Sequence, residues 1–166
     1  MPNRRTMFGA LAAGAAAFFG WRALDGETAI AEANSFEVTK TAAEWRGKLT
    51  PAQFQVLREH GTERPGTSAL NREKRKGTFA CAGCDLPLFS ADAKFESGTG
   101  WPSFWQPLPN AVETQTDRSL LMARTEVHCR RCGGHLGHVF NDGPRPTGLR
   151  YCMNGVAMNF TPDRAA

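Results

Sequence analysis

The sequence lacks a clustered basic face, an internal repeat and a long hydrophobic run. Its net charge is +4 over 166 residues, and its densest run of charged residues, Arg72–Lys76, has the form of a solvated loop that ends before Gly77. Nucleic-acid-binding proteins usually gather their basic residues on one face, so we expect no nucleic-acid partner. A chain of this length with 41% hydrophobic residues is long enough to bury one core, and we expect a monomer with one domain.

The abundance of turn residues favours a loop-rich β domain over a helical one. The chain contains 17 Gly and 10 Pro, which is typical of short strands joined by turns. From Gly77 onward, short extended runs are separated by Gly, Pro and Asp. The break at Asp117–Ser119 predicts a hairpin between runs 112–116 and 121–127, and the odd-numbered residues of the second run should form one face.

One short helix is predicted near the start of this domain. Thr50 and Gln53 have the spacing of a capping box, with Pro51 in the first helical position. Gly61 should end the helix. We expect it to lie across the core as a support, with Trp45 packed beside it.

The first residues have the composition of an export signal. Arg4–Arg5 precedes a weakly apolar stretch at 7–21, which at fifteen residues is short for a bilayer span. A small-x-small cleavage site ends at Ala31, and the whole resembles a twin-arginine signal. We therefore expect export to the periplasm, with residues 1–31 removed and 32–44 as a linker. The alternative is a retained N-terminal membrane anchor; otherwise a membrane is expected to matter only for export.

Four of the five cysteines form two Cys-x-x-Cys pairs. Two such pairs supply the sulfurs of a closed, tetrahedral zinc site, and their long separation indicates a clip between two loops of a larger domain. A disulfide within each pair is less favoured because it closes a tiny loop. A redox motif belongs at a strand-to-helix junction, and neither pair precedes a helical pattern. The predicted zinc ligands are Cys81, Cys84, Cys129 and Cys132.

Cys152 is left without a partner. An odd cysteine beside two ligand-like pairs is a candidate reactive thiol. If residues 148–154 are extended, Arg150, Cys152 and Asn154 share one face, and a nearby guanidinium favours the nucleophilic thiolate. The alternative is a buried structural cysteine. The catalytic interpretation is favoured because Arg150 and Asn154 share the face of Cys152 and two histidines lie upstream.

Two glycine-rich loops supply further candidates. His135 and His138 follow the second cysteine pair directly and are suited to proton transfer. Asp142, a few residues later, is a candidate to orient a histidine or to hydrogen-bond the reacting group. Trp101 follows Gly98–Gly100 and is a candidate wall for a small apolar pocket that accepts a methyl or thioether group.

Four motifs, taken in order, resemble those of one family. They are Cys81-x-x-Cys84 with Pro87–Phe89, Ser97–Phe104, Cys129–Phe140 and Gly148–Asn154. They make the stretch from Trp45 to Phe160 closely similar to methionine sulfoxide reductase B, which restores one epimer of oxidised methionine. The resemblance implies a mainly β domain over residues 45–166, with two antiparallel sheets in a barrel-like arrangement, a short helical support, a structural zinc, and reduction of methionine-R-sulfoxide in proteins.

The resemblance also implies roles for single residues. The family's nucleophile matches Cys152, and the ring that receives the substrate's methyl group matches Trp101. The remaining matches are the proton-relay residues His135 and His138, the site residue Asp142, and the thiolate-stabilising residues Arg150 and Asn154.

One position departs from the pattern of many relatives. Thr99 stands where they carry a second, resolving cysteine, so no thiol remains for an internal disulfide once four cysteines hold zinc. The expected partners are therefore oxidised proteins as substrate and an external reductant, either a thioredoxin-like protein or a small thiol. Two other functions stay open at this point: a zinc-ribbon binding module without catalysis, and a thiol–disulfide oxidoreductase that uses the paired cysteines.

Overall fold

The structure is a computed structural model that describes residues 36–119 and 123–164. Its helices are α1 (Ala42–Lys48) and α2 (Pro51–Glu59), with short 3-10 turns η1 (Ala69–Arg72), η2 (Ala91–Ala93) and η3 (Gly155–Ala157). Its strands are β1 (Gly77–Cys81), β2 (Pro87–Ser90), β3 (Lys94–Phe95), β4 (Ser103–Phe104), β5 (Val112–Asp117), β6 (Arg124–Cys129), β7 (His135–Phe140), β8 (Arg150–Met153) and β9 (Met158–Pro162). The expected signal at 1–31 and its cleavage site after Ala31 lie outside the described residues.

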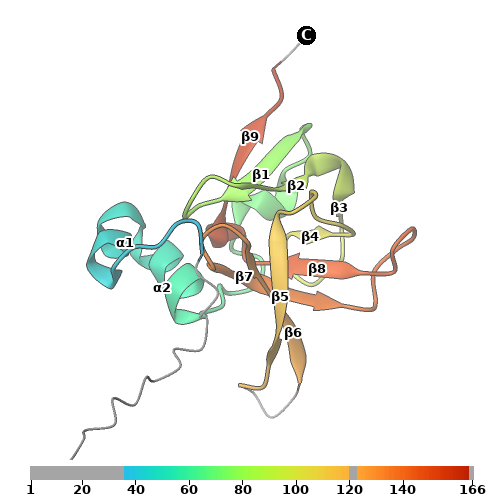
Figure 1. Cartoon of the computed structure of the whole chain (residues 1–166). Coiled ribbons are helices and arrows are strands. Elements are labelled where there is room, and N and C mark those ends of the chain that lie inside the picture. The colour runs from blue at the N-terminus through green and yellow to red at the C-terminus, as the bar shows by residue number, and fades with distance from the viewer. Residues whose placement is uncertain (1–35, 120–122, 165–166) are drawn as a thin grey trace, which may run out of the picture. The chain divides into compact units, whose positions relative to one another are not determined.

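The strands form two antiparallel sheets (Figure 1). The smaller sheet has the order β2-β1-β9, and the larger has the order β3-β4-β8-β7-β6-β5. This confirms the mainly β class with two antiparallel sheets. In the described part of the chain both sheets are open, because the outer strands of each sheet do not pair with one another. The expected barrel-like closure is therefore not formed.

A cluster of phenylalanines joins the two sheets. Phe79 of β1 and Phe89 of β2 pack against Phe104 of β4, with ring centroids 4.9 and 4.3 Å from that of Phe104. All three side chains are fully buried, and each such aromatic pair contributes about 0.5–1.5 kcal/mol beyond the area that it buries. This phenylalanine cluster fixes the smaller sheet to β4, the strand that neighbours β8 and Cys152.

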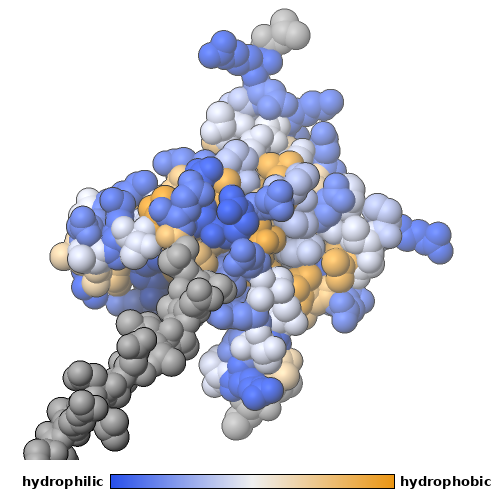
Figure 2. All heavy atoms as spheres, in the orientation of Figure 1, coloured by the Kyte–Doolittle hydropathy of each residue, from blue (hydrophilic) through white to orange (hydrophobic). Residues whose placement is uncertain are grey.

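On the surface of the molecule, hydrophobic residues appear as patches among hydrophilic ones (Figure 2).

The two helices lie together at one side of the sheets (Figure 1). α2 begins as predicted, because Thr50 and Gln53 exchange both hydrogen bonds of a capping box. It ends at Glu59, and His60 rather than Gly61 takes the left-handed conformation beyond it. α1 was not predicted and starts within the segment assigned to a linker. Neither helix of residues 36–119 and 123–164 is long and apolar enough to cross a membrane.

The predicted hairpin is formed by β5 and β6. β5 ends at Asp117, at the predicted turn. In β6, Thr125 is exposed, whereas Glu126 is buried beside Val127. Of the odd-numbered residues that the structure describes in this run, Val127 is buried, whereas Ala123 and Thr125 are exposed. Leu121, the first residue of that expected face, lies outside the described residues.

Candidate active site and metal cluster

The four paired cysteines converge on one point. Cys81 ends β1 and Cys129 ends β6, so each sheet contributes one pair. The Sγ atoms of Cys81 and Cys132 are 3.8 Å apart, those of Cys84 and Cys129 are 3.5 Å apart, and all four lie within 4.8 Å of one another. Tetrahedral coordination with metal–sulfur bonds of about 2.3 Å gives sulfur–sulfur separations of about 3.8 Å. The cluster therefore fits a metal ion, which would join the two sheets.

The helices cover this cluster. Arg58 of α2 donates to the carbonyl oxygen of Cys132 from both terminal nitrogens, at 3.0 and 3.1 Å, and its Nη2 lies 3.8 Å from the Cys132 Sγ. The same guanidinium lies 4.7 Å from the ring centroid of the buried Trp45. Hydrogen bonds from the other thiols, Cys129 first, lower the pKa of Cys132. The fold thus gives the cluster a positive charge and an apolar cover.

Cys152 lies in the middle of the larger sheet. In the register of that sheet it stands opposite Ser103 of β4 on one side and His138 of β7 on the other. Directly opposite residues of antiparallel strands share a face, with Cβ atoms about 4.5–5.5 Å apart, so His138 is a neighbour of the thiol. Gly137 permits this approach, because a Cβ atom there would collide with the carbonyl oxygen of Cys152.

A pocket of about 120 Å³ opens beside Cys152. Trp101 lines it, and the indole Nε1 donates to the carbonyl oxygen of Glu63 at 3.1 Å. Asn154 also lines it; its Oδ1 accepts from the Glu63 amide at 2.9 Å, and its Nδ2 donates to the carbonyl oxygen of Leu136 at 3.1 Å. Four of the predicted residues therefore meet at one pocket: Trp101, His138, Cys152 and Asn154.

A chain of hydroxyl groups lies beside the thiol. Thr99 Oγ1 is 3.8 Å from Cys152 Sγ, within the range of a hydrogen bond to sulfur. Ser97 Oγ lies 2.9 Å from Thr99 Oγ1 and 2.7 Å from Ser103 Oγ. The residue at the position of the family's second cysteine therefore contacts Cys152 directly.

His138 is held by an acid. Its Nε2 lies 2.8 Å from Oδ2 of Asp117, which also accepts from Arg124 Nη2 at 2.6 Å. Burial lowers the pKa of His138, and the hydrogen bond to Asp117 opposes that shift. Hydrogen bonds from Ser119, and then from His138, hold the pKa of Asp117 well below its usual range. Asp117 is therefore ionised, and its charge favours a proton on His138.

His135 lines a second cavity, of about 460 Å³, which shares His138 with the thiol pocket. Its Nδ1 lies 2.6 Å from Oε1 of Glu126, and the same oxygen is 3.0 Å from Nδ1 of His60. Burial raises the pKa of Glu126, but hydrogen bonds from His135 and Gln115 bring it down to about 2. The rings of His135 and His138 meet edge to face, with centroids 5.4 Å apart. The structure thus places His135 beside His138 and outside the thiol pocket.

Arg150 and Asp142 form a bidentate pair. Arg150 Nε donates to Oδ1 and Nη2 donates to Oδ2, both at 2.8 Å. The guanidinium lies 4.4 Å from the ring centroid of Phe140, which lines the thiol pocket. The pKa of Arg150 is raised first by Asp142 and further by Cys152. Asp142 therefore holds Arg150, and its hydrogen bonds go to neither histidine.

Three charged residues of this region were missed by sequence reasoning: Glu63, Asp117 and Glu126. Charged side chains in strands and loops usually face water, so nothing in their spacing indicated burial or partners. The Glu63 carboxylate accepts from the amides of Gly155 and Val156 at 2.6 and 3.0 Å, which fixes the turn after Asn154. The one available signal was the place of Asp117 at the predicted turn.

Fold and site together define a class of protein, in which a four-cysteine cluster clips two antiparallel sheets and a separate thiol lies in a pocket with an aromatic wall. The SelR domain model matches residues 49–162. This chain belongs to the SelR-domain family, and the resemblance seen in the sequence is confirmed.

The chain is also similar to several curated proteins that carry the name peptide methionine sulfoxide reductase MsrB. It is 54% identical to that of Leptospira interrogans over 127 residues, which cover 76% of this chain and 97% of the relative. It is 53% identical to that of Agrobacterium fabrum over 134 residues, 80% and 99% of the two chains. It is 55% identical to that of Pseudomonas putida over 127 residues, 76% and 96% of the two chains.

Proposed function

We propose that this chain reduces methionine-R-sulfoxide residues in peptides and proteins to methionine, with Cys152 as the nucleophile. Membership of the SelR family and the near full-length similarity to named reductases support the reaction. The observation that carries the roles is the cross-strand pair of Cys152 and His138 beside a pocket lined by Trp101.

The site residues divide the reaction between them. The Cys152 thiolate attacks the sulfoxide sulfur while the ring of Trp101 receives the methyl group. His138, which is opposite Cys152, gives a proton to the sulfoxide oxygen, and His135 acts behind it. The oxygen passes to Cys152, whose sulfur is oxidised by two electrons as the substrate sulfur is reduced by two. The products are methionine and a sulfenic acid on Cys152. Arg150, held by Asp142, and Asn154 support the thiolate and the pocket.

The experiment that tests this function compares the two epimers of one substrate. Purified protein is incubated with a peptide that contains methionine-R-sulfoxide or methionine-S-sulfoxide, with dithiothreitol as reductant. We expect turnover of the R epimer alone. Reduction of neither epimer, with the fold and metal content intact, would contradict the proposal and favour a binding module.

We propose zinc as the ion of the four-cysteine cluster, in a structural role. Four thiolates in two Cys-x-x-Cys pairs are the donor set of closed zinc sites, and Arg58 and Trp45 shield the cluster. Cys81, Cys84, Cys129 and Cys132 would hold it, and no step of the reaction passes through it.

The oxidised enzyme is expected to wait for an external thiol. Thr99 offers a hydroxyl, not a thiol, to Cys152, and the other four cysteines are gathered in the metal cluster. A thiol from a thioredoxin-like protein or a small molecule condenses with the sulfenic acid to give a mixed disulfide and water, and a second thiol releases Cys152. After one turnover without reductant, mass spectrometry should find a dimedone adduct on Cys152 with zinc still bound.

The variant Thr99→Cys provides the matched comparison. Because Thr99 contacts Cys152, the new thiol should attack the sulfenic acid, so that an internal disulfide replaces the dimedone adduct. A disulfide in the wild-type protein between Cys152 and a cluster cysteine, with zinc released, would show that this account is wrong.

Asp117 is expected to set the alkaline limit of the reaction. Its carboxylate raises the pKa of His138 against the effect of burial, so Asp117→Asn should lower that pKa further. A reaction that needs protonated His138 declines as pH rises through this pKa. The decline in kcat/KM should therefore occur at lower pH in the variant, with a loss of about tenfold at alkaline pH. Glu113→Gln, a charge removal on the same strand, should leave the profile in place; identical profiles for Asp117→Asn and wild type would refute the role.

We propose that residues 1–31 direct export to the periplasm and are removed after Ala31. The arginine pair, the weakly apolar stretch and the small-x-small site support this. Cell fractionation with N-terminal sequencing should find a chain that begins at Glu32 in the periplasm. Full-length chain in the membrane would favour an anchor, and full-length chain in the cytoplasm would reject export.

A further inference from the structure

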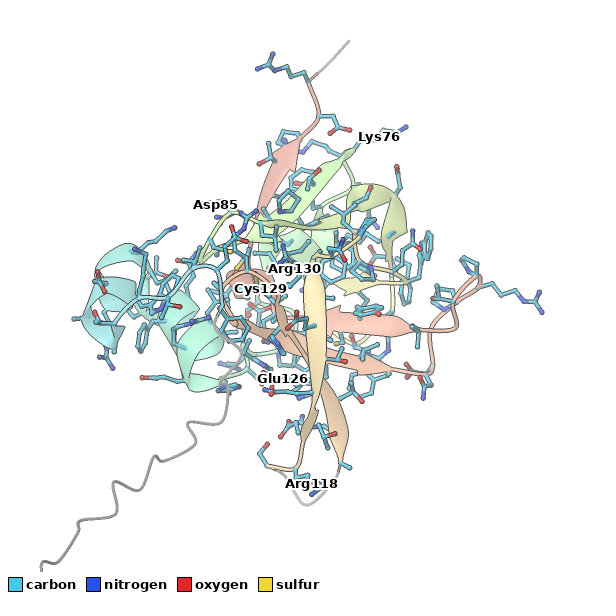
Figure 3. The ribbon with its side chains drawn as sticks, in the orientation of Figure 1. Lys76, Asp85, Arg118, Glu126, Cys129 and Arg130 are labelled. Carbon is cyan, nitrogen blue, oxygen red and sulfur yellow. The ribbon has the colours of Figure 1, made fainter. Side chains whose placement is uncertain are left out.

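Three side chains outside the thiol pocket converge on the larger cavity. His60 follows α2, Glu126 lies on β6 and His135 begins β7. The Nδ1 atoms of the two histidines lie 3.0 and 2.6 Å from the same carboxylate oxygen, Oε1 of Glu126. The ligand atoms of all three residues are within 4.8 Å of one another. Figure 3 shows Glu126 on the β5–β6 hairpin, between Arg118 near its tip and Cys129 of the metal cluster.

Two of the three residues are buried. The side chains of His135 and Glu126 are 3% and 6% exposed. Glu126 Oε1 is the shared partner of both Nδ1 atoms. The arrangement concentrates two imidazoles on one buried carboxylate oxygen beside a cavity of about 460 Å³, which is more donor capacity than the fold itself uses.

We propose that His60, Glu126 and His135 bind a divalent transition-metal ion of the zinc type, at a site separate from the four-cysteine cluster. Two imidazoles and one carboxylate are a known donor set of open zinc sites, in which a fourth position is left for water. Bonds of about 2.0–2.1 Å place ligand atoms about 3.3 Å apart around a tetrahedral ion. The observed 2.6 and 3.0 Å separations thus need only a small opening of the triad.

The surroundings suit entry and retention of such an ion. The side chain of His60 is 60% exposed and lies at the mouth of the cavity, whereas Glu126 and His135 are buried. Gln115 Nε2 donates to the other carboxylate oxygen, Oε2 of Glu126, at 2.6 Å. This bond orients the carboxylate so that Oε1 faces the two imidazoles, as an outer-shell partner does in metal sites.

Occupation of this site should slow sulfoxide reduction. The ring of His135 is 5.4 Å from that of His138, so an ion bound by His135 would remove it from its supporting role behind His138. This consequence rests on the proposed function, whereas the binding of the ion does not.

Binding is tested by titrating Co²⁺ into the full chain after zinc has filled the four-cysteine cluster. We expect one equivalent to bind with weak visible bands and without the intense sulfur-to-cobalt charge-transfer absorption that a thiolate site gives. His60→Gln should weaken this binding by at least about tenfold through loss of a ligand. Glu59→Gln, which alters an adjacent residue of similar exposure paired with Arg46, should bind as wild type does. Failure of the zinc-loaded wild-type chain to bind Co²⁺, or equally tight Co²⁺ binding by His60→Gln, would overturn the site.

Inhibition is tested in a single turnover without added thiol, because thiol reductants such as dithiothreitol chelate zinc. The rate of methionine formation from an R-sulfoxide peptide is measured for each protein with and without Zn²⁺. Zinc should slow wild type and Glu59→Gln at least about tenfold, because it takes His135 out of the proton relay, and His60→Gln much less. Binding without any slowing would overturn the inhibitory role. Absence of turnover in every arm, with Co²⁺ still bound, would instead reject the proposed function and leave the site standing.

Discussion

Cys152→Ser is expected to abolish sulfoxide reduction. A hydroxyl in place of the thiolate removes both the nucleophile and the atom that accepts the oxygen, and loss of a catalytic nucleophile typically lowers kcat by about a thousandfold or more. Because Cys152 lies on an internal strand whose neighbours are otherwise unchanged, the variant should fold and keep its metal. The measurement is the rate of R-sulfoxide reduction at saturating dithiothreitol, with zinc content and thermal melting recorded for the same samples.

Tyr151→Phe is the matched control. Tyr151 belongs to the same strand, but its side chain points to the other face, where its ring lies 5.9 Å from that of Phe89. This variant should retain activity. Substantial turnover by Cys152→Ser would show that another group carries the chemistry and would end the assignment of Cys152.

The thiol and the cluster were predictable because their signals are local or compositional. Two Cys-x-x-Cys pairs indicate a metal site at any fold position, and the alternation of a strand places Arg150, Cys152 and Asn154 on one face. The pairing of β7 with β8 places His138 opposite Cys152. The spacing of residues along the chain does not reveal this neighbour. Sequence reasoning placed the two histidines near the thiol but could not separate the one in the pocket from the one behind it.

The places of the three acids were not predictable for a related reason. Asp117, Glu126 and Glu63 resemble ordinary surface charges, and only their partners make the burial of Glu126 and the partial burial of the other two favourable. Those partners come from other elements, such as His135 of β7 for Glu126 and the amides of Gly155 and Val156 for Glu63. The missing barrel closure is also a property of pairing between strands, which periodicity within each strand does not determine.

The same substitution at a different cysteine should act on stability. Cys84→Ser removes one ligand from the cluster that links β1 of the smaller sheet to β6 of the larger one. This link ties the two sheets together beside the helices, and Arg58 would then face an incomplete ligand set. We expect the free energy of unfolding to fall by about 4 kcal/mol or more, the range in which loss of a structural metal lies.

A loss of this size lowers the melting temperature by roughly 10 °C or more for a domain of this length. Calorimetry of Cys84→Ser, with zinc measured in the same preparation, gives the result. Cys152→Ser is the control, because it makes the same chemical change outside the cluster and should melt within about 2 °C of wild type. Addition of a strong chelator to wild type should reproduce the Cys84→Ser melting curve. The same chelator should lower the melting temperature of the variant little further. If Cys84→Ser melts with wild type, or if stable wild-type protein contains no zinc, the cluster does not hold the sheets together and its metal is not structural.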